Sequence, residues 1–402
     1  MTIRKCLFLT MLLLTTAGPC VNAQKREIGQ ARTYIKSGKN LDKAEESMRM
    51  LLTDSVNIGN IKIYTTLAEA VKKQYEQVNE RVYLRLPYDT VVFFNTTKKM
   101  FDAYEKLDSA LVKYGNRQDG NDKTRAKNAE YLSAYRVNLY NGGLFLLKRN
   151  DFRKALSMFD AYLDCHSQPL FSAYGAIEDD HLAPLAASRS LYCGYKMQDY
   201  GEVLRNRELA MKDTQRLELT MQCLSETYSF MNDTTGYVSM LQEGFGKFPN
   251  SSYFFTHLID HYNGVSDFKS ALSVADAALE HDSCGTLYLY AKSNIMLNMG
   301  RYDECIELCD RIIAINDSIP DAYYNAGIAY INNALTMEKM RGGSKKKQQI
   351  RSLYSKSLSY MEKYRALSPA DKDKWGAALY NIYLKLNMGK EFEEIDAILR
   401  QP

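Results

Sequence analysis

Residues 302–313 read YDECIELCDRII, and this stretch decides the fold. After the leading Tyr302, apolar side chains recur three and four positions apart, which is the spacing of one face of an α-helix. The four residues LNMG at 297–300 come just before it. LNMG returns at 386–389, again directly before an apolar helical phrase, FEEIDAIL at 392–399. The stretch therefore belongs to a repeat.

The same kind of phrase recurs through the last two thirds of the chain, each time led by an aromatic residue. The leading aromatic residues are Phe152, Tyr200, Tyr237, Phe268, Tyr302, Tyr354 and Phe392. Successive gaps are 48, 37, 31, 34, 52 and 38 residues, a period of about 34 with two insertions, which is typical of a solenoid. We interpret LNMG as the end of one helix and the tight turn into the next.

A second helix is expected before each phrase. The clearest is DAYYNAGIAYI at 321–331, where Tyr323, Ala326, Gly327 and Tyr330 recur at helical spacing. This pair of patterns resembles the tetratricopeptide repeat family, whose helix A and helix B carry such residues, from near Asn138 onward. Several repeats lack the helix-A glycine or the closing proline. The resemblance implies an all-α, right-handed superhelical solenoid of tetratricopeptide-like hairpins with seven or eight repeat units.

The chain divides into three predicted segments. Residues 1–23 have a basic start, an apolar run and a small-residue end, which predicts a secretory signal cleaved before Gln24. Residues 17–20, AGPC, resemble a lipobox, so lipidation of Cys20 is the alternative. Pro19 departs from that motif, which has a small residue just before the cysteine. Residues 24–120 predict atypical helical repeats. The Gly- and Asn-rich stretch at 115–123 marks the boundary to a solenoid over 121–402, with insertions near 165–184 and 333–351.

Charge and cysteine content exclude some classes. Without residues 1–23, which hold Arg4 and Lys5, 50 basic and 48 acidic side chains remain (52 − 2 and 48 − 0), a balance that argues against a nucleic-acid footprint. Cys305 and Cys309 fall on one apolar helical face and are expected in the core. Disulfide bonding among Cys165, Cys193, Cys223 and Cys284 stays open.

No constellation predicts catalysis, a cofactor or a metal. The first insertion contains His166, Glu178, Asp179, Asp180 and His181, without the spacing of a ligand motif. His257 and His261 lie four apart, but Leu258 stands where a zinc protease has glutamate. GxSxG, CxxC and a complete phosphate loop are absent from the sequence. We therefore expect a protein that is not an enzyme.

The second insertion, MRGGSKKKQQIR at 340–351, predicts an exposed basic loop. Lys345, Lys346 and Lys347 either contact an anionic surface or are simply solvated. Asp-Ser/Thr triplets are a further pattern, which resembles the O-glycosylation acceptor of some exported Gram-negative proteins and also fits helix caps. They begin at Asp54, Asp89, Asp108, Asp233 and Asp317.

These patterns predict a non-enzymatic protein–protein interaction scaffold of the bacterial cell envelope, exported to the periplasm or associated with the outer membrane. A solenoid presents a concave groove of helix-A side chains to an extended peptide or a partner's helix. The alternative is a glycan or small-ligand capture protein of a nutrient-uptake system. By the resemblance, the groove residues are Thr256, Asp260, Asn263, Tyr290, Asn294, Asp321, Tyr324 and Ile328.

Overall fold

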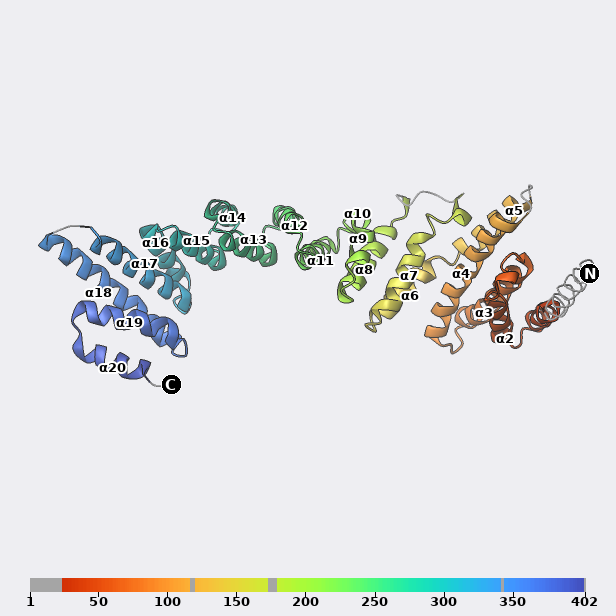
Figure 1. Cartoon of the computed structure of the whole chain (residues 1–402), viewed down its shortest axis with the longest axis horizontal. Coiled ribbons are helices and arrows are strands. Elements are labelled where there is room, and N and C mark those ends of the chain that lie inside the picture. The colour runs from red at the N-terminus through yellow and green to blue at the C-terminus, as the bar shows by residue number, and fades with distance from the viewer. Residues whose placement is uncertain (1–23, 116–119, 173–178, 341–342, 401–402) are drawn as a thin grey trace, which may run out of the picture. The chain divides into compact units, whose positions relative to one another are not determined.

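The computed structural model describes residues 24–115, 120–172, 179–340 and 343–400. Helices make up most of this part of the chain, and no strand occurs in it (Figure 1). The chain forms two compact units, Met1–Thr227 and Tyr228–Pro402. We describe each unit separately.

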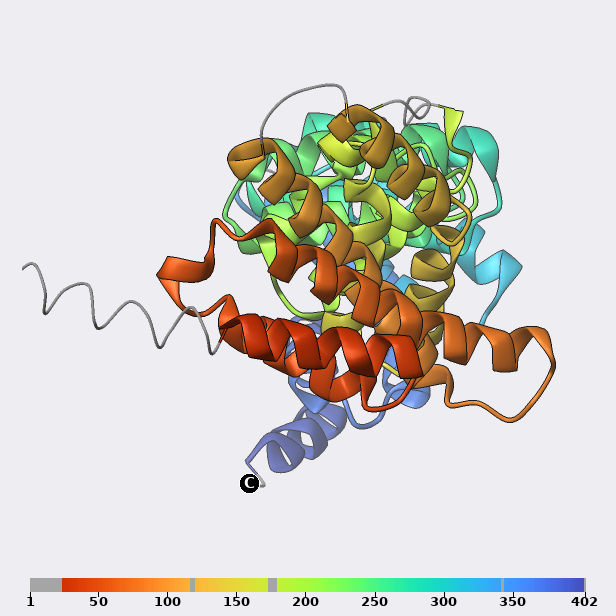
Figure 2. The same cartoon turned by 90° about the vertical axis from the view of Figure 1, so that its right-hand side faces the viewer.

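Unit 1 begins with a helix over residues 24–37 and continues as antiparallel helical neighbours (Figures 1 and 2). Helices α2 and α3 pack together, α3 packs on α4, and α6, α7, α8 and α9 each contact the next. The elements are α2 (Leu41–Leu51), η1 (Ser55–Asn57), α3 (Ile61–Tyr83), α4 (Thr90–Tyr114), α5 (Gly120–Ser133), α6 (Val137–Leu147), α7 (Phe152–Asp164), η2 (Pro169–Phe171), α8 (Ala183–Lys196), α9 (Tyr200–Arg205), α10 (Arg207–Ala210) and the greater part of α11 (Leu217–Phe230).

Unit 2 is a stack in which the successive helices from α12 to α20 contact one another. Its core includes Cys305, Cys309, Tyr354 and Trp375, so the two neighbouring cysteines are buried as predicted. The elements are α12 (Thr234–Lys247), α13 (Ser252–Gly264), α14 (Phe268–His281), α15 (Thr286–Asn298), α16 (Tyr302–Ile315), α17 (Pro320–Glu338), α18 (Ser344–Leu367), α19 (Lys372–Leu386) and α20 (Gly389–Leu399). The predicted all-α array of helical hairpins is confirmed.

A recurring turn joins helix A to helix B. The second residue before helix B has a left-handed backbone conformation, as at Asn150 and Ser266 (both with φ of 58°). The next residue is an aspartate that caps helix B. The carboxylate accepts a hydrogen bond from the amide three residues on, at 3.3 Å for Asp151 and 3.1 Å for Asp267. An aspartate at this position satisfies one amide that the helix start leaves without a partner. The same device occurs at Gln198–Asp199 and Asn232–Asp233.

Both copies of LNMG lie at a turn from helix A to helix B with a left-handed residue, as the sequence predicts, but Arg301 and Met388 stand in place of the capping aspartate. In the first copy, α15 ends at Asn298 and Gly300 is the left-handed residue, with φ of 74°. In the second copy, Asn387 takes the left-handed conformation, with φ of 60°, and Gly389 already starts α20. The repeat of letters therefore marks the same turn with a shifted backbone register.

The prediction of an exposed basic loop at 333–351 is wrong for most of its length. The insertion instead lengthens both helices of one hairpin, because α17 has 19 residues and α18 has 24, against 13 and 14 in α15 and α16. Lysine, glutamine and arginine are good helix formers, and buried Ala334 extends the packed side of α17. Lys345, Lys346 and Lys347 thus belong to the first turn of α18.

Other predictions about organisation stay predictions. Residues 1–23, which carry the predicted secretory signal and Cys20, lie outside the described residues, as do 116–119 within the predicted boundary. Helix α4, on one side of that boundary, packs against α5, α6 and α7 on the other side. Among the described helices, none is both long and apolar enough to cross a membrane.

Candidate functional site

The first helices of successive hairpins in unit 2 share a face that carries half of the predicted groove residues. Helix α15 contacts α17, and α17 contacts α19. Tyr290 and Asn294 come from α15, and Asp321 and Tyr324 come from the first turns of α17. We call the surface of Tyr290, Asn294, Asp321, Tyr324 and Lys374 the helix-A face. Lys374 belongs to α19.

Lys374 is the member that the sequence did not reveal. Its Nζ lies 3.9 Å from Oδ1 of Asp321 and 5.6 Å from the ring centroid of Tyr324. The Tyr324 ring also lies against the Tyr364 ring, with 5.1 Å between the ring centroids. The helix-A face therefore combines an acid, a base and aromatic rings within one small area.

Buried amides support the polar side chains of this face. The Nδ2 of Asn325 donates to Oδ1 of Asn294 and to Oγ of Ser293, each at 3.1 Å. Asn325 is 2 % exposed, so these bonds hold α15 against α17 in a fixed register. Asn294 is thereby oriented rather than free to rotate.

The surroundings of Tyr290 favour its neutral form. Burial raises the pKa of its hydroxyl, and the negative charge of Asp321 raises it further, whereas the hydrogen bond with Asn294 lowers it. The net shift of the pKa is upward from an ordinary value near 10. A tyrosine hydroxyl is neutral at neutral pH in any case, and the upward shift of the pKa extends this neutral range to higher pH.

Adjacent tyrosines of α17 point in different directions, in agreement with the predicted helical register. Tyr323 is 8 % exposed, belongs to the core, and donates from its hydroxyl to the carbonyl oxygen of Asp317 at 3.1 Å. Tyr324 is half-buried, and the side chain of Asp321 is 47 % exposed. Tyr324 and Ile328 both pack against the core cluster that contains Tyr323.

The three predicted groove residues of α13 are placed differently. The Thr256 hydroxyl donates a hydrogen bond within its own helix, to the carbonyl oxygen of Ser252 at 2.8 Å. Asp260 is exposed. The Oδ1 of Asn263 is buried and has no hydrogen-bond partner within the described residues. A ligand-binding role for all eight groove residues stays a prediction.

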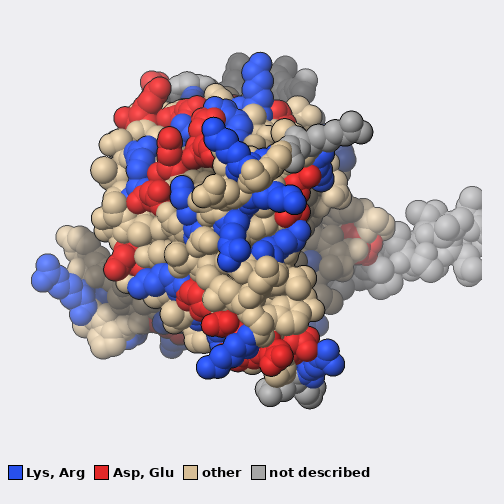
Figure 3. Space-filling view, turned by 90° about the vertical axis from the view of Figure 1, so that its left-hand side faces the viewer, with Lys and Arg blue, Asp and Glu red and all other residues tan. Residues whose placement is uncertain are grey.

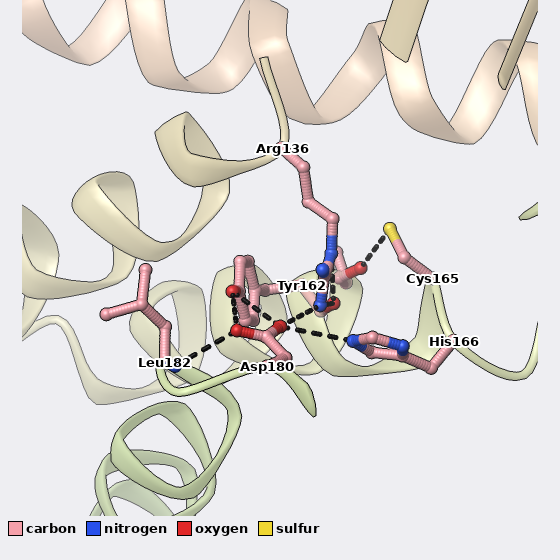
Figure 4. A network of polar contacts seen from close by, with 7 residues as sticks. Arg136, Tyr162, Cys165, His166, Asp180 and Leu182 are labelled. Carbon is pink, nitrogen blue, oxygen red and sulfur yellow. Dashed lines mark hydrogen bonds and ion pairs between the residues drawn. The ribbon is translucent and has the colours of Figure 1, made fainter. Parts of the chain in front are cut away.

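The acidic first insertion is held by one carboxylate in unit 1. Oδ2 of Asp180 accepts from Nη2 of Arg136 at 2.8 Å and from the Tyr162 hydroxyl at 2.7 Å, and Nε2 of His166 lies 3.1 Å away (Figure 4). Oδ1 accepts from the Leu182 amide at 3.0 Å. We call these residues the Asp180 network.

Charge and hydrogen bonds keep Asp180 ionised. Burial by itself would raise the pKa of the carboxyl, but the bonds from Tyr162, His166 and the Leu182 amide, together with the charge of Arg136, lower it to about 2. Both oxygens are already engaged by protein donors. The network therefore anchors the insertion to α7 and to the start of α6.

The remaining metal candidates do not come together in the described residues. Asp179 and His181 are exposed, Glu178 lies outside the described residues, and no group of three metal-ligating side chains occurs among those described. His257 bonds through Nδ1 to the carbonyl oxygen of Tyr253 at 2.9 Å and stacks on that ring, with 4.2 Å between centroids.

The cysteines of the described chain are all free thiols. Five are buried, and Cys284 is exposed. The thiol of Cys165 donates to the carbonyl oxygen of Ala161 at 3.1 Å, and burial raises its pKa to about 12. Cys193 has its pKa raised to about 12 by burial as well. Neither thiol is activated as a nucleophile.

Most Asp-Ser/Thr triplets occur where an aspartate caps a helix. Asp54, Asp89 and Asp233 each accept from a backbone amide at the start of η1, α4 and α12. The triplet at Asp108 lies inside α4, where Asp108 pairs with Arg125 at 2.7 Å, so it does not belong to a loop.

No family model matches this chain. Over 93 residues, 23 % of this chain, it is 28 % identical to Hsp70-Hsp90 organizing protein 2 of Arabidopsis thaliana, and it spans only 16 % of that protein. Among solved structures, it is similar to the C-terminal part of a TPR repeat-containing protein from Cytophaga hutchinsonii, with 12 % identity and a TM-score of 0.45 over 64 % of this chain and 92 % of that one. It is also similar to YrrB, a TPR protein described as having an unusual peptide-binding site, with 16 % identity and a TM-score of 0.25 over 61 % and 92 %. Both TM-scores are below 0.5, and the assignment of the fold rests on this chain's own helices and repeats.

Proposed function

We propose that this chain, an all-α array of tetratricopeptide-like helical hairpins, is a non-enzymatic scaffold that binds a partner protein on its helix-A face. The partner presents an extended peptide or a single helix. The observation that carries the proposal is the grouping of five side chains on α15, α17 and α19, the first helices of three successive hairpins. These side chains are Tyr290, Asn294, Asp321, Tyr324 and Lys374.

The chemistry of the helix-A face suits a peptide. Aromatic rings supply contact area at a low cost in side-chain entropy, and the Asn294 amide can satisfy a peptide backbone group. Asp321 and Lys374 are 3.9 Å apart and about half-exposed, so each can exchange this weak contact for a charged group of the partner. A face that carried only packing residues would show neither the opposite charges nor an oriented amide.

The setting in the cell envelope belongs to the same proposal. It is supported by the basic, apolar and small-residue order of residues 1–23, which is typical of an export signal. Contact of the lysines at 345–347 with an anionic surface, and O-glycosylation at Asp-Ser/Thr triplets, are finer proposals. Both finer proposals need side chains that an anionic surface or a modifying enzyme can reach, and Lys345 and Ser109 are exposed.

A photo-crosslinking amino acid placed on the surface tests the proposal in cells. Placed at Asp321, it should give a discrete adduct with one protein, because the helix-A face is covered by the partner. Placed at Glu307, which is exposed on α16 of the helix-B side, it should not give that adduct. An adduct of equal yield from Glu307, or none from Asp321, would show that the partner binds elsewhere.

A further inference from the structure

An open pocket of about 510 Å³ lies in unit 2, where the ends of α17 and α19 meet the first half of α18. Its polar lining is mostly cationic, from Lys346, Lys347, Arg351 and Lys385, with Ile350 as apolar wall. Figure 3 looks onto this end of α18 and shows Lys and Arg side chains gathered there. Pockets of this size commonly hold small molecules.

The single carboxylate of the pocket is already neutralised. Both Oε atoms of Glu338 accept from Nζ of Lys385 at 2.9 Å, and Oε1 also accepts from the Tyr354 hydroxyl at 3.2 Å. Glu338 therefore does not offset the other cations of the lining.

The other three cations have no acidic partner. Lys346 donates to the carbonyl oxygen of Met340, and Arg351 donates to that of Leu386 at 3.4 Å. In the part of the chain that the structure describes, no Asp or Glu lies within ion-pair distance of Lys346, Lys347 or Arg351. The pocket thus holds a surplus of three positive charges.

Helix capping explains only part of this surplus. Cations are favourable at the C-terminal ends of α17 and α19, which Lys346 and Arg351 reach. However, Lys345, Lys346 and Lys347 also occupy the first turn of α18, where the positive end of the helix dipole repels them. Lys347 has no role in either end cap. A bound anion would relieve this repulsion.

We propose that the pocket binds a small organic molecule through a phosphomonoester group. A dianionic phosphate offsets more of the surplus charge than a single carboxylate does, and its oxygens accept from the Arg351 guanidinium and the Lys347 ammonium. The organic part of the molecule packs on Ile350 and on the buried Tyr354 ring at the base. This site is separate from the helix-A face and stands whether or not that face binds a protein.

Titration calorimetry on the whole exported chain tests the site, with phenyl phosphate as the probe and benzyl alcohol as the uncharged comparison. Phenyl phosphate should bind at one per chain, and benzyl alcohol should not. Lys347→Gln and Arg351→Gln should each weaken binding by about tenfold or more, the effect of a lost charged hydrogen bond.

The matched control is Lys345→Gln, which removes the same charge from the same turn of α18 but from outside the pocket lining. Its affinity should stay within about twofold of the wild type, because an exposed charge is screened. An equal loss in Lys345→Gln would overturn the pocket in favour of diffuse attraction. Binding to phosphatidylglycerol vesicles without binding of phenyl phosphate would also overturn the pocket and would identify a lipid surface. Absence of phenyl phosphate binding at millimolar concentration would overturn the pocket as well.

Discussion

Oγ of Ser357 donates a 2.8 Å hydrogen bond to the carbonyl oxygen of Gly327, across the contact between α17 and α18. Both residues are buried. At the same contact, a Cβ added to Gly327 would overlap the sulfur of Met361 and lie 2.8 Å from its Cγ. The glycine therefore leaves room for the Met361 side chain where the two helices meet.

Gly327→Leu should lower the free energy of unfolding of unit 2 by about 1–3 kcal/mol, because it overpacks a filled contact. Combining it with Met361→Ala should recover part of that loss, since the smaller side chain vacates the clashing volume. Gly246→Leu is the matched control, because nothing lies within 4 Å of a Cβ at that helical glycine. Chemical denaturation of five proteins would decide: the wild type, each single variant, the double variant and the control. Additive losses in the double variant would show that Gly327 and Met361 are not in contact.

Asp180→Asn should destabilise unit 1 by about 1–3 kcal/mol at neutral pH, since Arg136 and Tyr162 lose a charged acceptor. The folded pKa of about 2 lies below the unfolded value, near 3.9. Asp180 therefore stabilises the fold above about pH 4, and this contribution is lost as the pH falls through about 2. Thermal melting curves should show that the difference in stability between the variant and the wild type becomes smaller below pH 4. A difference that does not change with pH would contradict the network.

Lys345→Glu should raise the stability of unit 2 by about 0.3–1 kcal/mol, because it replaces a cation at the positive end of α18 with an anion. Lys363→Glu, a change of the same charge on an exposed part of α18 near its other end, should be neutral or slightly unfavourable. Thermal melting at low salt measures both. If Lys345→Glu melts at or below the wild-type temperature, the first turn of α18 does not begin where the structure has it.

The hairpins could be predicted because their signal is local and repeated. The aromatic residues at Phe152, Tyr200, Phe268 and Tyr302 each begin a helix B in the structure. The basic insertion was predicted as an exposed loop, although its flanking residues favour helix and Ala334 is buried. Local composition does not reveal such tertiary packing.

The candidate site was predictable in part. Helical spacing predicted that Tyr323 packs in the core, and it is buried there, whereas Asp321 is about half-exposed. The binding role of Asp321 and Tyr324 stays a prediction. Lys374 was missed because its partner Asp321 is 53 positions away in the sequence, and only the stacking of α17 and α19 brings them together. The Asp180 network was missed for the same reason, since Arg136 lies 44 residues before Asp180.

The central claim is that the helix-A face binds the partner, and the affinity of folded variants for the crosslinked partner tests it most directly. Asp321→Ala and Tyr324→Ala should weaken that affinity by about tenfold or more while cooperative melting stays near the wild type. Tyr323→Ala should instead cost about 3–5 kcal/mol of stability and leave the affinity per folded molecule unchanged. Wild-type affinity in both Asp321→Ala and Tyr324→Ala, with the partner still bound, would contradict the account.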